Sequence, residues 1–244
     1  MNTNYEPIDP KARKLDVSKE PKLEEISIVA MGPTWYQCPA EAAPNSEIWG
    51  VNTMYRNRKL DRIFIMHDIK HDLMVQDRDF FETVNALNIP VITAGDYPKL
   101  KNNYVFPAEE VTEYFGVAFF LNVMAWMIAY AIMLEPKRIS LYGCDMRSDS
   151  GDEYRLGERG CVEFWLGMAM GKGIDLGLPQ ESFLLKRIMR GNFYGYHLRK
   201  MPQGLDELIP TAVKRQYSKY KMVPLNDDGS EINDPTLISM FGKG

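Results

Sequence analysis

The sequence predicts an α/β fold, namely a Rossmann-like and mostly parallel sheet with helices on both faces. Short apolar runs recur along the chain, each ending in a small or polar residue, and longer helical patterns separate several of them. Strands that alternate with helices favour parallel pairing. The runs are apolar at consecutive positions, which is typical of strands covered on both faces. A chain of 244 residues is expected to form one main domain with additions.

The expected strands come in a regular order along the chain. The first two, with the sequences ISIVAMG and EIWGVN, end in glycine and asparagine, and the third, DRIFIMHD, ends in His-Asp. IPVITAGD and RISLYGCD end in aspartate. The predicted strand ranges are 26–32, 47–52, 61–68, 89–96, 138–145 and 173–179, with a further short strand at 104–106.

Three helices are expected between these strands. Residues 77–87 place apolar side chains on one stripe, and residues 160–173 are closed by glycines. Residues 117–134 are apolar on all sides, which is typical either of a buried helix or of a membrane span. Because this segment contains Asn122 and has no basic flank on its N-terminal side, we predict a buried helix and no membrane contact.

The two ends of the chain differ in composition from the middle. Residues 1–24 form a polar arm without a signal-peptide pattern, residues 25–180 the predicted Rossmann-like domain, and residues 181–244 a basic, aromatic extension expected to pack on that domain. The three cysteines are an odd number, at spacings that predict neither a disulfide framework nor a zinc site. We therefore expect the chain in a reducing cytoplasm.

Positive charge gathers in the segment 186–221. It holds nine Lys or Arg residues against two acidic residues, although the net charge of the chain is −4. With aromatic residues between the charges, the segment predicts either a contact with phosphates or nucleic acid or an ordinary solvated surface. The residues that would contact DNA are Lys186, Arg187, Arg190, Arg199, Lys200, Lys214 and Arg215.

The ends of five predicted strands carry small or polar residues. In open α/β sheets, ligands bind at the carboxyl ends of the strands, near a topological switch point. We therefore expect one crevice, in which Asp145 or His67 acts as a general base. The strand-end residues are Gly32, Asn52, His67, Gly95 and Asp145.

Three of these positions keep alternative interpretations. The turn MGPTW can bring the backbone at Gly32 close to a nucleotide, or it can be a structural turn. Asn52 can read a base or a ribose through its amide, or it can close the strand with an Asx-turn. His67, four residues before His71, can be a polar crevice residue, a structural histidine or a metal ligand.

The stretch LYGCDMRSDSGDEYRLGERG is acidic but does not match a calcium loop. An EF-hand that starts at Asp145 needs an acid at position 3, glycine at 6 and glutamate at 12, where Arg147, Ser150 and Leu156 stand. We therefore expect no divalent metal, and a solvated, mobile loop over residues 147–157. Glu163, on the helix that follows, is a further candidate for catalysis.

The segments GPTW, EIWGVNTMYR and DRIFIMH, with LYGCDM and DEYRLGERGCVEFWLGMAMGKGIDL, resemble a group of bacteriophage-encoded Rossmann-like proteins over residues 26–178. More distantly, the first half is similar to bacterial sialyltransferases and to pterin pyrophosphokinase-like proteins. In the sialyltransferases, a G-x-G-P-S turn and an asparagine that ends the second strand hold the donor nucleotide. Gly32, Pro33, Thr34 and Asn52 match those positions, and Ala30 replaces the first glycine.

This resemblance implies a glycosyltransferase-like enzyme that uses a nucleotide sugar as donor, with a modified base in phage DNA as acceptor. The alternative is a nucleotide-binding protein or hydrolase that acts on or sequesters a nucleotide without sugar transfer. A homo-oligomer is compatible with the sequence. The residues expected to bind the nucleotide are Gly32, Pro33, Thr34, Asn52, Gly95, Tyr142 and Gly143.

Overall fold

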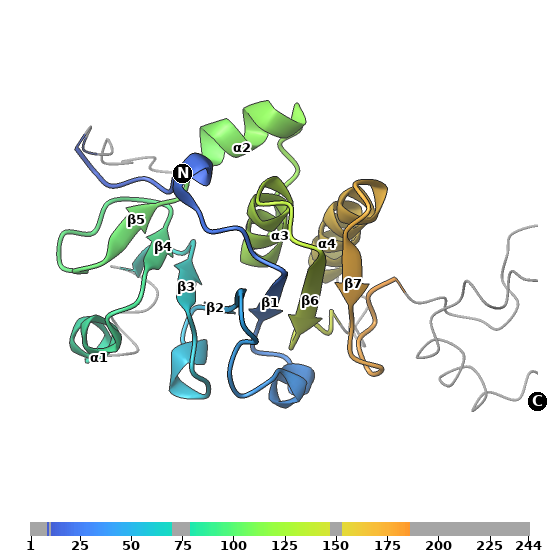
Figure 1. Ribbon diagram of the computed structural model, residues 1–244, viewed down its shortest axis with the longest axis horizontal. Coiled ribbons are helices and arrows are strands. Elements are labelled where there is room, and N and C mark those ends of the chain that lie inside the picture. The colour runs from blue at the N-terminus through green and yellow to red at the C-terminus, as the bar shows by residue number, and fades with distance from the viewer. Residues whose placement is uncertain (1–8, 10, 70–78, 147–152, 186–244) are drawn as a thin grey trace, which may run out of the picture. The chain divides into compact units, whose positions relative to one another are not determined.

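The computed structural model describes residues 9, 11–69, 79–146 and 153–185, and these residues contain a seven-stranded sheet (Figure 1). Neighbouring strands are parallel throughout the order β5-β4-β3-β2-β1-β6-β7. The predicted α/β fold with a Rossmann-like sheet is therefore confirmed. The strands are β1 (Glu25–Val29), β2 (Ser46–Val51), β3 (Arg62–Ile65), β4 (Val91–Thr93), β5 (Asn103–Val105), β6 (Arg138–Tyr142) and β7 (Asp175–Gly177).

The sheet grows in two directions from β1. The chain adds β2, β3, β4 and β5 on one side of β1, and then crosses back to place β6 and β7 on the other side. Glu25 at the start of β1 pairs with Ser46 of β2 and with Arg138 of β6, so these three strands begin at the same edge of the sheet. The carboxyl ends of β1 and β6 therefore form the topological switch point, which is where open α/β sheets bind ligands.

Helices cover both faces of the sheet, because both faces are apolar. The helices α3 (Val123–Met133) and α4 (Glu153–Gly171) pack on one face, in the core that contains Ile28 of β1. The helix α1 (Phe80–Leu87) packs on the other face, in the core that contains the next residue, Val29. Successive residues of a strand point to opposite faces, so an apolar run supplies both cores.

The region before the apolar helix differs from the prediction. A helix that the sequence analysis missed, α2 (Ala108–Phe115), ends at Gly116, whose φ of +66° is typical of a helix C-terminus. The predicted helix 117–134 begins only at Val123, because Asn122 caps it by accepting a hydrogen bond from the Ala125 N–H at 2.9 Å. It is buried as predicted. None of the described helices is long and apolar enough to cross a membrane.

Helix α4 begins earlier than predicted. It starts at Glu153, so the prediction of a loop is wrong for residues 153–157, and residues 147–152 lie outside the described residues. Glycines and mixed charges in this stretch suggested a loop. The buried side chains of Val162 and Trp165 hold the helix against the sheet, and such packing stabilises helices more than intrinsic propensity does.

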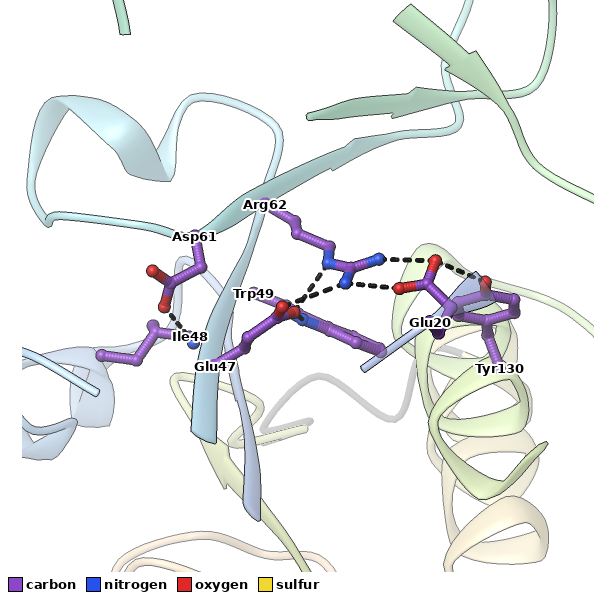
Figure 2. A network of polar contacts seen from close by, with 7 residues as sticks. All are labelled: Glu20, Glu47, Ile48, Trp49, Asp61, Arg62 and Tyr130. Atoms are coloured by element: carbon purple, nitrogen blue, oxygen red, sulfur yellow. Dashed lines mark hydrogen bonds and ion pairs between the residues drawn. The ribbon is translucent and has the colours of Figure 1, made fainter. Parts of the chain in front are cut away.

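A buried ionic network closes the amino edge of the sheet (Figure 2). Arg62, the first residue of β3, donates to the two oxygens of Glu20 at 2.9 and 2.6 Å and to those of Glu47 at 2.6 and 3.0 Å. The Tyr130 hydroxyl donates to Glu20 at 2.9 Å, and the indole N–H of Trp49 donates to Glu47. The network therefore joins the segment before β1 to β2, β3 and α3.

Short segments complete the described chain. Part of the N-terminal arm extends the sheet, because Lys14 pairs in parallel with Val105 of β5. The basic segment 186–221, with the predicted DNA contacts, and His71 lie outside the described residues. The 3-10 helices are η1 (Val17–Lys19), η2 (Pro33–Gln37) and η3 (Met54–Arg56).

Candidate functional site

A cleft of about 400 Å³ opens at the carboxyl ends of β1, β2, β3 and β6. Its volume is within the usual range for sites that bind small ligands. The cleft includes the switch point between β1 and β6, and the start of α3 and the second turn of α4 contribute to its walls. The lining residues are Ala30, Met31, Gly32, Pro33, Val51, Asn52, His67, Leu121, Asn122, Val123, Met124, Gly143, Cys144, Asp145, Met146 and Glu158.

This cleft brings together most of the site residues predicted from the sequence. Parallel pairing places the ends of their strands at one edge of the sheet, as expected. The predicted residues that line the cleft are Gly32, Pro33, Asn52, His67, Gly143 and Asp145. The predicted residues that are not among its lining are Thr34, Gly95, Tyr142 and Glu163.

Three of these four residues, namely Gly95, Tyr142 and Glu163, have other surroundings. Gly95 follows β4, which lies in the outer part of the sheet. Tyr142 packs in the core on the α1 side, where burial raises the pKa of its hydroxyl. Glu163 pairs with Arg159 of α4 at 2.8 Å. Their proposed contacts with a ligand therefore have no support in the cleft geometry.

Asp145 fastens the turn after β1 to the end of β6. Its two carboxylate oxygens accept hydrogen bonds from the Thr34 hydroxyl at 2.6 Å and from the Thr34 N–H at 3.0 Å. The Thr34 hydroxyl oxygen in turn accepts from the Gly143 N–H at 2.8 Å. The Gly32 N–H donates to the Gly143 carbonyl, also at 2.8 Å. Two chain segments 109 to 111 residues apart thus form one wall of the cleft.

This network changes the roles expected for Thr34 and Asp145. Thr34 was expected to bind the nucleotide, but its N–H at the start of η2 already donates to the Asp145 carboxylate. Thr34 is 4% exposed and Asp145 is 7% exposed. Thr34 therefore fixes the turn from below the cleft. For Asp145, the engagement of both oxygens favours a positioning role over that of a general base.

Glycine is required where the two segments meet. A β-carbon at Gly32 would lie 2.5 Å from the Gly143 carbonyl oxygen and 2.6 Å from Oδ2 of Asp145. Gly143 has a φ of +64°, and a β-carbon there would collide with the Ala30 carbonyl oxygen. The glycine in the turn thus serves the close approach of backbone to backbone. Gly32→Val would therefore disturb the fold as well as the cleft, because the added side chain has no space between the two segments.

Asn52 lines the cleft and carries a buried acceptor that is unsatisfied in the described structure. It follows β2 with a φ of +49°, a left-handed conformation that asparagine tolerates better than most residues. Its backbone N–H donates to the Phe64 carbonyl at 3.0 Å, while its side-chain Oδ1 is buried without a hydrogen-bond donor in the described structure. Buried polar atoms are normally paired, so this oxygen indicates a ligand donor. Nε of Arg58 is also buried and unpaired, but Arg58 does not line the cleft.

The amino end of α3 forms the opposite wall, which the sequence analysis did not assign to the site. The Asn122 side chain caps α3 and also donates to the carbonyl of Glu158 on α4 at 3.2 Å. The first N–H groups of a helix have no partner within the helix and attract anions. An asparagine just before an apolar run is a recognised helix-start signal, so Asn122 could have been found. The sequence around Glu158 contains no motif that identifies this residue as part of the cleft.

The charged side chains of the described lining are mainly acidic. Asp145 and Glu158 contribute carboxylates, His67 is exposed at the rim, and no Lys or Arg is found among these lining residues. Burial raises the pKa of the Cys144 thiol, so this group stays protonated in the wall. Within the described ranges, no three His, Cys, Asp or Glu side chains lie close enough together to hold a metal ion.

Comparison with known proteins shows distant structural likeness. No protein-family model and no curated protein matches the chain. The sialyltransferase CstII from Campylobacter jejuni, in complex with CMP-3FNeuAc, is similar at 13% identity and a TM-score of 0.40, over 63% of this chain and 79% of that chain. The complex of CstII with cytidine-5′-monophosphate is 14% identical to this chain and has a TM-score of 0.41, over 64% of this chain and 79% of that chain. The α-2,3-sialyltransferase Cst-I from the same organism is 14% identical and has a TM-score of 0.32, over 97% of this chain and 84% of that chain. These TM-scores are too low to assign a function.

Proposed function

We propose that the cleft binds the nucleotide of an activated sugar and that the chain is a glycosyltransferase-like enzyme. The observation that carries this proposal is the buried Oδ1 of Asn52, a residue of the cleft lining, which has no hydrogen-bond donor among the described residues. An unsatisfied buried acceptor costs about 1–3 kcal/mol, and a ligand that supplies a donor recovers that free energy. Ribose hydroxyls and the exocyclic amines of cytosine and adenine are donors of the required kind.

The phosphate of the donor is best placed at the start of α3. The backbone N–H groups of Val123 and Met124 lie in the first turn of this helix and in the cleft wall. The positive end of the helix dipole is equivalent to about half a charge, whereas the described lining adds the carboxylates of Asp145 and Glu158. We therefore expect a nucleoside monophosphate sugar to bind more tightly than a nucleoside diphosphate sugar.

In the proposed reaction, the hydroxyl oxygen of an acceptor bonds to the anomeric carbon of the sugar. The bond from that carbon to the phosphate oxygen breaks, and the nucleotide leaves with the electron pair. The N–H groups at the start of α3 stabilise the charge on the leaving phosphate. His67 at the rim takes the proton of the acceptor hydroxyl, and Asp145 keeps the wall in place through Thr34.

Calorimetric titration with CMP, UMP, AMP and GMP tests the binding step. We expect one of these nucleotides to bind, and Asn52→Gly to weaken its affinity about tenfold or more, as loss of one buried hydrogen bond implies. Glycine is the right replacement because it accepts the φ of +49°. Asn45→Gly is the matched control, since Asn45 has a φ of +57° but does not line the cleft. No binding by the wild type, or equal affinity in both variants, contradicts the proposal.

Dependence on an acceptor tests the transfer step. A modified base that carries a hydroxyl group, in DNA, is the acceptor that we propose, on the basis of the basic segment 186–221. The DNA used in the test contains such a base. The donor sugar is incubated with and without DNA, and release of free nucleotide is measured. Release that requires DNA and labels it supports transfer. Release without any acceptor identifies a hydrolase, and binding without release identifies a protein that only sequesters the nucleotide.

A further inference from the structure

The solvent face of α4 is apolar, although a helix on the surface of a sheet normally exposes polar residues. From residue 156 to the end of α4, every residue that is exposed in the described structure is glycine or apolar. The side chains of Leu156, Phe164 and Met170 are 52%, 37% and 57% exposed. We call this face the α4 strip; its residues are Leu156, Gly160, Phe164, Gly167, Met170 and Gly171.

The described packing of the chain does not require the glycines of the α4 strip. A β-carbon at Gly160, Gly167 or Gly171 would meet no described atom within 4 Å, and none of the three has a positive φ. Glycine destabilises a helix interior relative to alanine. Gly160 and Gly167 lie in the interior of α4 and therefore weaken it without a local structural reason among the described residues, whereas Gly171 is the last residue of the helix. Glycine on a helix surface allows the backbone of another element to approach closely.

We propose that the α4 strip is the interface of a two-fold symmetric dimer of this chain, in which the two α4 helices pack antiparallel. The strip is self-complementary about a point between Glu163 and Phe164, as an interface between identical surfaces requires. With the two-fold axis at that point, Gly160 of each copy lies opposite Gly167 of the other. The spacing of seven residues between these glycines is the repeat of helices that stay in contact along their length.

The other residues of the α4 strip are compatible with this pairing. Leu156 reaches the level of Gly171 of the second copy, so a large side chain meets a small one. Phe164 lies beside the axis and meets its own copy. Glu163 is at the same level, and its partner Arg159 on the same helix, at 2.8 Å, keeps an unpaired carboxylate out of the interface.

The size of the α4 strip predicts a dimer of modest affinity. Sixteen helical residues are about 24 Å long and the helix is about 10 Å wide. Each copy would therefore cover on the order of a few hundred Å², which is less than the roughly 800 Å² per partner of a standard specific interface and is typical of weak, transient association. Phe119, which packs against Phe164 at 5.7 Å between ring centres, adds to the edge. We expect a dissociation constant in the micromolar range.

Sedimentation velocity of the full chain from 1 to 200 µM tests the association. We expect reversible dimerisation in the wild type, and at least a tenfold weaker dimer for Gly167→Leu. The same variant should have a higher melting temperature as a monomer, because leucine favours helix and the position is open. Glu113→Leu, which adds an apolar side chain to the exposed surface of α2, is the control and should not change the association. A monomeric wild type, or a dimer unaffected by Gly167→Leu, overturns the proposal.

Cysteine cross-linking tests the antiparallel register. The native cysteines Cys38, Cys144 and Cys161 are buried and do not interfere. Gly160→Cys and Gly167→Cys are prepared separately and oxidised alone or as a mixture at a concentration that favours dimer. A disulfide-linked dimer in the mixture, well above either variant alone, supports the register. Equal cross-linking in the single variants, or none in the mixture, contradicts it.

Discussion

The two edges of the sheet use buried polar groups in opposite ways. At the amino edge, Arg62 donates to Glu20 and Glu47, so each charge finds its partner within the chain (Figure 2). At the carboxyl edge, Asp145 accepts hydrogen bonds from Thr34, and the side-chain oxygen of Asn52 has no donor among the described residues. A complete network holds elements together, whereas an incomplete one marks where a ligand can supply the missing group.

Arg62→Met removes the cation of the ionic network at the amino edge. It leaves the carboxylates of Glu20 and Glu47 buried without a cation, which destabilises proteins by about 3–5 kcal/mol. Urea unfolding followed by circular dichroism measures the free energy of unfolding. Arg56→Met is the control, because its pair with Asp79 is exposed and contributes about 1 kcal/mol or less. Similar losses in the two variants would show that the buried network adds no stability.

Gly143→Ala adds a β-carbon where two backbone segments meet at the carboxyl edge. Alanine at a φ of +64° is strained by about 1–2 kcal/mol, and the collision with the Ala30 carbonyl adds about 1–3 kcal/mol. Gly116→Ala is the matched control, since Gly116 has a φ of +66° and no atom within 4 Å of a β-carbon in the described structure. The difference between the variants therefore isolates the collision. Equal losses in thermal unfolding would mean that the two backbones can separate without penalty.

Asp145→Asn tests whether Asp145 positions the cleft wall or acts as a general base. The amide places a donor against the donors of Thr34, so we expect a loss of about 1–3 kcal/mol of stability. Thr34→Val removes the two hydrogen bonds of the Thr34 hydroxyl and leaves the carboxylate and its bond from the Thr34 backbone N–H in place. If Asp145 positions the wall, both variants lose stability and turnover together. A loss of turnover of about 100-fold in Asp145→Asn alone, with stability unchanged, would identify Asp145 as the base.

Tyr130→Phe tests how the Tyr130 hydroxyl at the amino edge contributes to the pH dependence of stability. Burial, reinforced by the charge of Glu20, raises the pKa of Tyr130 in the folded protein. The unfolded chain ionises this tyrosine near its ordinary pKa of about 10, so the stability it contributes is present below that pH and is lost above it. We expect Tyr130→Phe to cost about 1 kcal/mol at pH 7 and to flatten the decline of stability between about pH 9.5 and 11. Parallel declines in both proteins would contradict this assignment.

Sequence patterns located the strands well and the helix ends poorly. Seven apolar runs were predicted and all seven contain strands, because burial on both faces leaves a local signature. The helix α2 was missed, since Val111 is its only fully buried side chain. The early start of α4 was missed because glycines and charges within it suggest a loop, while contacts with residues far away in the chain hold it in place.

The sequence by itself determined that small and polar residues end parallel strands, and therefore that Gly32, Asn52, His67 and Asp145 share one edge of the sheet. That inference needs only the period of the apolar runs and the parallel pairing that follows from alternating strands and helices. The role of each residue at this edge of the sheet depends on the tertiary structure. Asp145 binds Thr34 across 111 residues of chain, and Oδ1 of Asn52 has no donor within the described ranges, because hydrogen bonds between distant segments depend on how strands are ordered in space.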